Sequence, residues 1–347
     1  SPTLRREDRN ADGQPDTTTR FAAGVPTQKT EDSNFDGSID TTTTYQDGRI
    51  ATVEQDRDHD ARLDLIAEFN PDGSKRRERQ DANADGQLNI TIQYRDGVQI
   101  RVEDDTSGDG KPNIISHFEN EVITRRQADT RGDGRYDTEI RFEIGLEKTR
   151  TFDEDLDGVP EITAYLGAGG IVEREVLNSK DGSRLNRSYS NGVRTREEQD
   201  RDGDGRIDLI STFRGEELVR QEADSSHDGL FDTHIEFRAG KQVKQEEDRN
   251  ADGQVDAVYT FDDQEQLLQE SFDTTHDGAF DTVAHYQAGL LRRRSIDSTA
   301  RGNPDRNEFY ENVEGESVLI RVELDENLDG QVDVIEMRPR VDPPVAA

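Results

Sequence analysis

The sequence contains no cysteine and no tryptophan, and it has a single methionine. The absence of cysteine excludes disulfides and thiolate metal sites. Hydrophobic residues make up only 29 % of the chain, a share so low that it raises the question of disorder. No apolar run approaches the roughly 18 residues of a membrane span, so we expect no membrane insertion.

Charge of one sign dominates what is present. There are 78 acidic residues against 44 Lys and Arg, which gives a net charge of −34. Such a charge is self-repulsive and destabilises a compact chain unless cations are bound. We therefore expect no nucleic-acid partner, because the phosphate backbone would be repelled.

An acidic stretch recurs along the whole chain. The segment EDRNADGQPD at 7–16 returns as EDRNADGQVD at 247–256. The first Asp residues of successive copies are 24 or 25 residues apart nearly throughout. Fourteen units result, the eighth being a degenerate copy near Asn178. Strict periodicity argues against disorder and predicts a repeat architecture over residues 1–337. A weaker alternation between odd and even units suggests a larger unit of about 48 residues, seven times over.

Each unit reads as a loop followed by a β-hairpin. After the pattern DxNxDGxxD come alternating residues that end in an aromatic ring, as in DLIAEF (64–69) and NITIQY (89–94), and this period of two predicts a strand. A turn such as QDG or RAG follows. The charged segments VQIRVED (98–104) and KQVKQEE (241–247) then read as returning strands.

The acidic loop has the donor pattern of a calcium site. Ca²⁺ takes six to eight oxygen ligands, and short acidic side chains at positions 1, 3 and 5 point at one centre. Gly at position 6 permits a sharp turn, position 7 offers its backbone carbonyl, and position 9 closes the shell. We predict eleven or twelve occupied sites, whose Ca²⁺ ions would also offset much of the net charge.

The predicted ligands follow from these positions. Position 1 contributes Asp8, Asp32, Asp56, Asp81, Asp105, Asp129, Asp153, Asp200, Asp224, Asp248, Asp273 and Asp325. Position 3 contributes Asn10, Asn34, Asp58, Asn83, Ser107, Asp155, Asp202, Ser226, Asn250, Thr275 and Asn327. Position 5 contributes Asp12, Asp36, Asp60, Asp85, Asp109, Asp133, Asp157, Asp204, Asp228, Asp252, Asp277 and Asp329. Position 7 contributes the carbonyls of Gln14, Ser38, Arg62, Gln87, Lys111, Arg135, Val159, Arg206, Leu230, Gln254, Ala279 and Gln331. Position 9 contributes Asp16, Asp40, Asp64, Asn89, Asn113, Asp137, Glu161, Asp208, Asp232, Asp256, Asp281 and Asp333.

The loops resemble those of known calcium-binding families. The motif is similar to the loops of EF-hands and thrombospondin type 3 repeats, and most closely to the FG-GAP or VCBS type, in which DxNxDGxxD lies between strands, as in DRDGDGRIDLI (200–210). The resemblance covers the loops and implies calcium, while the 24-residue period is shorter than those families' blades. A true EF-hand has Glu at position 12; the last unit has it at Glu336, which we predict as a further ligand there.

Three units depart from the pattern. The eighth unit lacks its first Asp between Asn178 and Asn186, the sixth has Arg131 at position 3, and the thirteenth has Arg301 where a ligand belongs. The third unit has Ala61 in place of Gly and is expected to be strained but chemically intact.

Two architectures fit these hairpins. Charged returning strands such as KRRERQ (75–80) favour an all-β, elongated array with an aromatic face inward and odd and even hairpins as its two sides. The alternative is a closed seven-bladed β-propeller. The Pro-rich segment 338–347 leaves the repeat pattern and reads as a tail or linker.

The chemistry outside the loops is sparse. The six His residues are scattered, and no nucleophile, phosphate loop or zinc spacing emerges, so we predict a protein that is not an enzyme. Interpreting Ser1 as the start of a mature chain, we expect export to the extracellular space, the cell surface or the periplasm. The expected role is a calcium-rigidified spacer, fibre subunit or adhesion scaffold. The alternatives are a calcium-dependent module that binds a cell-surface glycan or protein, and an accessory domain of a larger surface protein. End-to-end self-assembly through sheet edges would suit the first role.

Overall fold

The computed structural model describes residues 3–338, which form 28 strands and one short 3-10 helix. Two compact units divide the chain, residues 1–171 and 172–347. The first unit contains β1 (Leu4–Glu7), β2 (Thr17–Ala22), β3 (Val25–Glu31), β4 (Thr41–Gln46), β5 (Arg49–Gln55), β6 (Leu65–Phe69), β7 (Lys75–Gln80), β8 (Ile90–Arg95), β9 (Val98–Asp104), β10 (Ile114–Glu119), β11 (Val122–Ala128), β12 (Thr138–Glu143), β13 (Leu146–Phe152), β14 (Ile162–Leu166) and the 3-10 helix η1 (Ala168–Gly170).

The second unit repeats the same arrangement. It contains β15 (Val172–Asn178), β16 (Arg184–Ser190), β17 (Val193–Asp200), β18 (Leu209–Arg214), β19 (Glu217–Ala223), β20 (Thr233–Arg238), β21 (Lys241–Glu247), β22 (Ala257–Phe261), β23 (Leu267–Phe272), β24 (Thr282–Gln287), β25 (Leu290–Ile296), β26 (Arg306–Val313), β27 (Glu316–Leu324) and β28 (Val334–Met337). No helix in the described part of the chain is long or apolar enough to cross a membrane.

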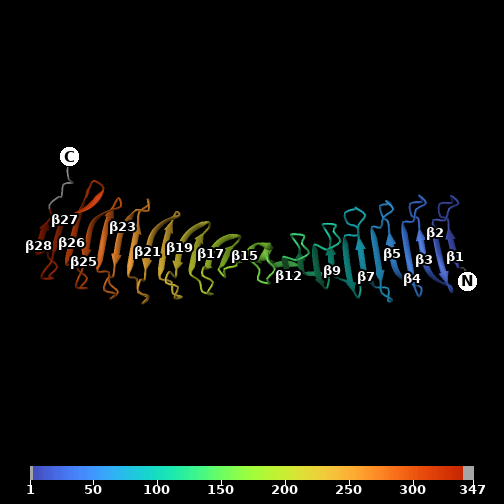
Figure 1. The fold of residues 1–347 in the computed structure, drawn as a ribbon, viewed down its shortest axis with the longest axis horizontal. Coiled ribbons are helices and arrows are strands. Elements are labelled where there is room, and N and C mark those ends of the chain that lie inside the picture. Colours follow the sequence, from blue (N-terminus) through green and yellow to red (C-terminus); the bar gives the residue numbers. More distant parts are fainter. Residues whose placement is uncertain (1–2, 339–347) are drawn as a thin grey trace. The chain divides into compact units, whose positions relative to one another are not determined.

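Within each unit the strands form an open antiparallel meander. Every strand pairs with its neighbours in the sequence, as β2 does with β1 and β3, and no pairing between described residues joins the first strand of a unit to its last (Figure 1). The expected all-β array is therefore confirmed, and the closed propeller is wrong. The reason is the strand pairing. The return strand of each hairpin also pairs with the first strand of the next hairpin, so the strands do not separate into blades.

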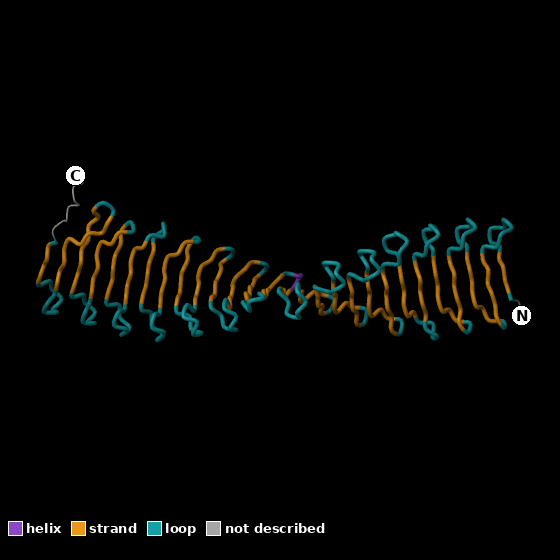
Figure 2. Tube along the Cα trace, in the orientation of Figure 1, coloured by secondary structure: helices purple, strands orange, loops and turns teal. Residues whose placement is uncertain are grey.

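The meander puts the two kinds of connection on opposite edges. Because successive strands run in opposite directions, all hairpin turns lie at one end of the strands and all acidic loops at the other (Figure 2). Neighbouring acidic loops are two strands apart, which is about 10 Å. Each unit therefore carries a row of acidic loops along one edge of its sheet.

A second sheet layer is absent from both units as far as residues 3–338 show. Strands contact their sequence neighbours and little else, so the expectation that odd and even hairpins form two sides is wrong. The aromatic rings are half-buried and several are covered by cations from adjacent strands: Arg194 lies 4.0 Å from the ring centroid of Phe213, and Arg321 lies 3.9 Å from that of Phe309. Cationic side chains thus replace the apolar layer that the alternation of the strands suggested.

Candidate metal centres

The first carboxylate of each loop holds the turn together. In the first loop the N–H of Gly13 donates to Oδ2 of Asp8 at 2.9 Å, and the same bond recurs between positions 6 and 1 in thirteen loops. Position 6 needs a positive φ for this bond, 91° at Gly13 and 70° at Ala61, which explains the near-invariant glycine within this chain. Ala61 keeps the bond, at 2.9 Å to Asp56.

The carboxylate at position 5 is fixed by two donors. Oδ1 of Asp12 accepts the N–H of Gln14 at 2.7 Å, and Oδ2 accepts the side-chain amide of Asn10 at 2.9 Å. These hydrogen bonds, the first of them the stronger cause, lower the pKa of Asp12 below its ordinary value, and the pKa of Asp36 is lowered in the same way by Ser38 and Asn34. Both carboxylates are therefore ionised across the physiological range, as a metal ligand must be.

The acidic group at position 9 reaches back across its loop. Oδ2 of Asp40 accepts the N–H and the hydroxyl of Ser33, both at 2.6 Å. Burial alone would raise the pKa of Asp40, but these bonds, together with those from His59 and Asn34, outweigh it and lower the pKa to about 2. In all the remaining loops that have the motif, a donor at position 2 or 3 likewise bonds to the side chain at position 9.

More aspartates than hydrophobic side chains are buried, and these aspartates lie in the loops. Among the described residues only eight hydrophobic side chains are buried, whereas fourteen aspartates are, all at position 1 or 9 of a loop. Asp137 is the most enclosed of them, at 2 % exposed. Burying an ionised carboxylate is costly unless a counter-charge or several donors accompany it. The loop edge of each sheet thus carries an array of negative charges that bound cations would stabilise.

Several carboxylates converge within metal-binding distance. In five groups of the described residues, ligand atoms lie within 4.8 Å of one another: Asp8, Asp12 and Asp16; Asp56, Asp58 and Asp64; Asp153, Asp155 and Glu161; Asp200, Asp202 and Asp204; and Asp202, Asp208 and His227. These groups could hold a metal ion. The first four groups combine positions 1, 3, 5 and 9, as the loop pattern predicts, and the fifth adds His227 of the following loop.

Two further observations fit a cation in these loops. Oδ1 of Asp153 is buried and has no hydrogen-bond partner among the described residues, so it is an acceptor without a donor. In the third loop, burial first and then repulsion from Asp60, Asp64 and Asp56 raise the pKa of Asp58. Crowded, partly unsatisfied carboxylates of this kind are what an oxygen-preferring divalent ion relieves.

The sixth loop supplies its own cation. The guanidinium of Arg131 lies 3.4 Å from Asp133 and 3.6 Å from Asp137, which are positions 5 and 9 of that loop. Arg131 therefore occupies charge-neutralising contacts that an ion would otherwise make. Asp133 is the last residue of an RGD tripeptide, and this ion pair ties it to the loop.

The other two irregular units differ from each other. The eighth has no acidic loop at all: the N–H of Ser179 donates to the carbonyl of Ser183, which closes a tight turn between β15 and β16. The thirteenth keeps the loop geometry, since Gly302 donates to Asp297 at 2.6 Å, although Arg301 occupies position 5. The predicted degenerate copies thus comprise one lost loop and one intact loop with the wrong side chain.

The remaining predicted ligands are the position-7 carbonyls and Glu336. The position-7 residues donate their N–H to the position-5 carboxylate, as Leu230 does to Asp228 at 2.8 Å, which leaves their carbonyls as the group available to an ion. Glu336 lies in β28 and accepts a hydrogen bond of 2.7 Å from Arg338, so its carboxylate is paired with a guanidinium group. The tail 339–347 lies outside the described residues.

Sequence reasoning missed a contact between loops. His59, His227 and His276 each occupy position 4 of a loop, and each imidazole Nδ1 lies against the position-9 carboxylate of the preceding loop: 2.9 Å to Asp40, 3.3 Å to Asp208 and 2.7 Å to Asp256. Their shared position in the repeat was the available signal. What the sequence could not provide was the register that places consecutive loops side by side.

Comparisons with known proteins add little to this geometry. No family model matches the chain, and no curated protein is significantly similar to it. Two solved structures of TcdB2-TccC3 match 89 % and 90 % of this chain at 12 % and 10 % identity, with TM-scores of 0.20 and 0.18. The matched region covers only 20 % and 25 % of those chains.

Proposed function

We propose that this protein is an exported, calcium-binding structural repeat protein, a spacer, fibre subunit or adhesion scaffold, whose acidic loops bind Ca²⁺. The observation that carries this proposal is the row of buried aspartates at loop positions 1 and 9. Oxygen-only donors at alternate positions, with a backbone carbonyl between them, suit Ca²⁺ better than a transition metal, which prefers imidazole or thiolate.

Bound calcium would also stabilise the folded state of so polar a sheet. Across residues 3–338 the strands have no second layer and few buried hydrocarbon side chains. If each loop binds with a dissociation constant of about 10 μM, a hundredfold excess of free calcium stabilises the folded state by about 2.7 kcal/mol per site. Eleven such sites would contribute more than the thin apolar core. A structural role is supported by the regular recurrence of these loops along the sheet edge.

Removal of the ion tests the proposal directly. The full chain is stripped with chelator, and its far-UV circular dichroism and thermal unfolding are recorded before and after addition of Ca²⁺, with Mg²⁺ as the comparison. We expect a large gain of β-structure and of melting temperature with Ca²⁺, and a smaller effect with Mg²⁺, which demands stricter octahedral geometry. A chelated protein that is fully folded and insensitive to Ca²⁺ would overturn the proposal.

A further inference from the structure

One row of side chains in the first compact unit, residues 1–171, is cationic although the protein as a whole is strongly acidic. Four side chains lie directly opposite one another on adjacent strands β9 to β12, and they are Arg101, His117, Arg125 and Arg141. We call these four residues the cationic row. Within it Arg125 and Arg141 are like charges directly opposite each other across strands, an arrangement that is destabilising. A chain of net charge −34 has ample acidic residues to avoid such a row.

The second unit shows what the same row looks like when charges alternate. There Arg220 lies opposite Glu236, and Glu236 lies opposite Lys244. Arg220 occupies the same place in its hairpin as Arg125, since each pairs with the residue that precedes an aromatic ring. The direct opposition of two arginines is therefore a local property of β11 and β12 and not of the repeat.

The cationic row keeps donors available to a ligand. Glu139 is shared by Arg125 and Arg141, at 2.6 and 2.8 Å, so two guanidinium groups divide one carboxylate. The side chains of Arg125 and Arg141 remain 42 % and 72 % exposed. Arg101 pairs with Glu103 at 2.7 Å, and its buried Nε has no acceptor among residues 3–338. The row thus has more N–H donors than the protein satisfies, and guanidinium groups favour carboxylate or sulfate oxygens.

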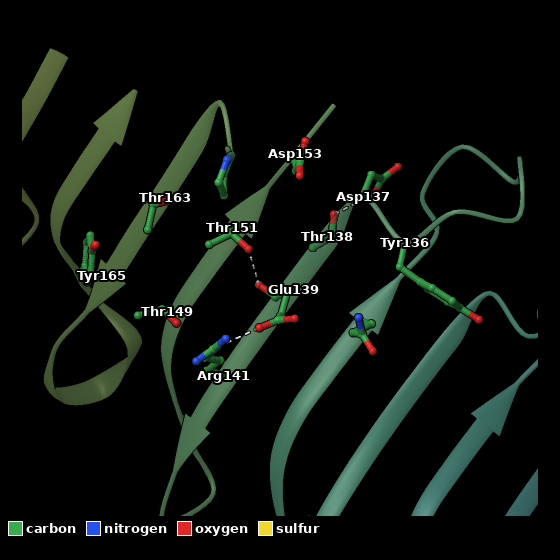
Figure 3. Close-up of a pocket in the computed structure, with 12 residues that line it drawn as sticks. Tyr136, Asp137, Thr138, Glu139, Arg141, Thr149, Thr151, Asp153, Thr163 and Tyr165 are labelled. Carbon is green, nitrogen blue, oxygen red and sulfur yellow. Dashed lines mark hydrogen bonds and ion pairs between the residues drawn. The ribbon is translucent and has the colours of Figure 1, made fainter. Parts of the chain in front are cut away.

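A cavity of about 490 Å³ adjoins the end of the row. Arg141, Thr149 and Tyr165 line it from three adjacent strands, and Thr151 and Thr163 add hydroxyl groups (Figure 3). Hydroxyl groups both donate and accept hydrogen bonds, whereas arginine only donates. Asp137, Glu139 and Asp153 also line the cavity, and their carboxylates accept hydrogen bonds from hydroxyl groups. A ligand that fits row and cavity together therefore carries its negative charge over the row and its hydroxyl groups over the cavity.

We propose that the cationic row and the adjoining cavity bind an anionic saccharide, a sugar chain bearing carboxylate or sulfate groups. Its charged groups contact Arg101, Arg125 and Arg141, and its ring hydroxyls contact the threonines of the cavity. The proposal goes beyond the structural role and rests on it in one respect: bound calcium reduces the negative charge that would repel such a ligand.

His117 provides an independent reporter of occupancy. Burial first, and then the charges of Arg101 and Arg125, lower the pKa of His117, while Glu139 opposes them. An anion placed on the row opposes the two arginines and raises that pKa. The imidazole resonance of His117 therefore titrates at higher pH in the complex than in the free protein.

The test uses the calcium-loaded full chain, after its calcium stoichiometry and circular dichroism have been measured. A sulfated hexasaccharide is titrated by calorimetry, with a neutral hexasaccharide and hexaglutamate as comparison ligands. Arg125→Gln is expected to weaken binding of the sulfated sugar about tenfold, as loss of one charge-assisted hydrogen bond would. Arg220→Gln, the same change at the matched position of the second unit, is expected to leave binding within twofold.

Each contrary result has a distinct meaning. Equal loss in the two variants, or no loss in either, would overturn the assignment to this row. Tighter binding of hexaglutamate than of the sugar would assign the row to acidic peptides, and self-association abolished by Arg125→Gln would assign it to a second copy of the chain. Absence of calcium binding in the preliminary measurement contradicts the structural proposal instead, so the two failures are distinguishable.

Discussion

The backbone N–H of Asp56 donates a hydrogen bond of 2.8 Å to the carbonyl oxygen of Asp40. Asp40 is position 9 of the second loop and Asp56 is position 1 of the third, so a ligand of one candidate site is bonded to a ligand of the next. The same bond recurs between Asp208 and Asp224 in the second unit. Two Ca²⁺ ions about 10 Å apart repel by only about 1.7 kcal/mol in water before screening. Adjacent loops can therefore be filled together.

Removal of one position-5 carboxylate should empty one loop and disturb its neighbour less. We expect Asp36→Asn to weaken calcium binding at the second loop about tenfold or more, because affinity falls when a charged ligand is lost. Through Asp40 and Asp56, the third loop should lose less affinity than the second. Calcium titration by calorimetry measures both effects. Asp47→Asn, in a hairpin turn at the opposite edge, is the matched control and should change neither site.

The glycine at position 6 should be worth about 1 kcal/mol of stability. Gly37 has a φ of 91°, and a Cβ added there would meet no atom within 4 Å, so the cost of Gly37→Ala is backbone strain alone. The reverse change, Ala61→Gly in the third loop, should stabilise the protein by a smaller amount because glycine also loses more entropy on folding. Denaturant unfolding in saturating calcium measures both variants. Equal stability of Gly37→Ala and the parent chain would refute the strain argument.

The thirteenth loop should gain an ion when its side chain is corrected. Gly302 and Asp297 already form the bond that holds the turn, and only position 5 carries a cation, Arg301. We expect Arg301→Asp to add one calcium ion to the stoichiometry. Adding Asp297→Asn to that variant should weaken the new site again. An unchanged stoichiometry in Arg301→Asp would show that the loop pattern is insufficient for binding.

Stability should fall in acid through His117. The pKa of His117 in the folded state lies below its ordinary value of 6.5, so the unfolded chain binds the proton more tightly. Protonation therefore favours unfolding, and this destabilisation develops as pH falls from above 6.5 through the folded-state pKa. His117→Gln should reduce the loss of stability between about pH 7 and 5 relative to the parent chain. His285→Gln, at the matched strand position of the second unit, is the comparison.

Much of the fold can be predicted from the sequence. The segments 98–104 and 241–247 were predicted as returning strands and are β9 and β21, because a charged segment in a single sheet still alternates between two faces. The acidic loop was predicted position by position, since its hydrogen bonds are local and recur wherever Asp and Gly hold their places. Even the odd alanine at position 61 adopts the expected turn.

Tertiary relationships were not legible to the same degree. Nothing in the hairpin pattern says whether an aromatic face packs on hydrocarbon or on arginine, and the sheet uses Arg194 and Arg321 where a second layer was expected. The contact of His59 with Asp40 depends on strand register across 19 residues, which the periodicity alone does not fix. The cationic row was invisible for the same reason, because its members come from four strands.

Calcium stoichiometry tests the central claim most directly. Chelator-stripped protein is titrated calorimetrically with Ca²⁺, and the variant Arg131→Asn is titrated beside it, since Arg131 contacts the loop carboxylates that an ion would bind. The account predicts eleven ions for the parent chain and one more for the variant. A parent chain that binds no calcium, or only one or two ions, would show that the buried aspartates are held by hydrogen bonds alone and would contradict the account.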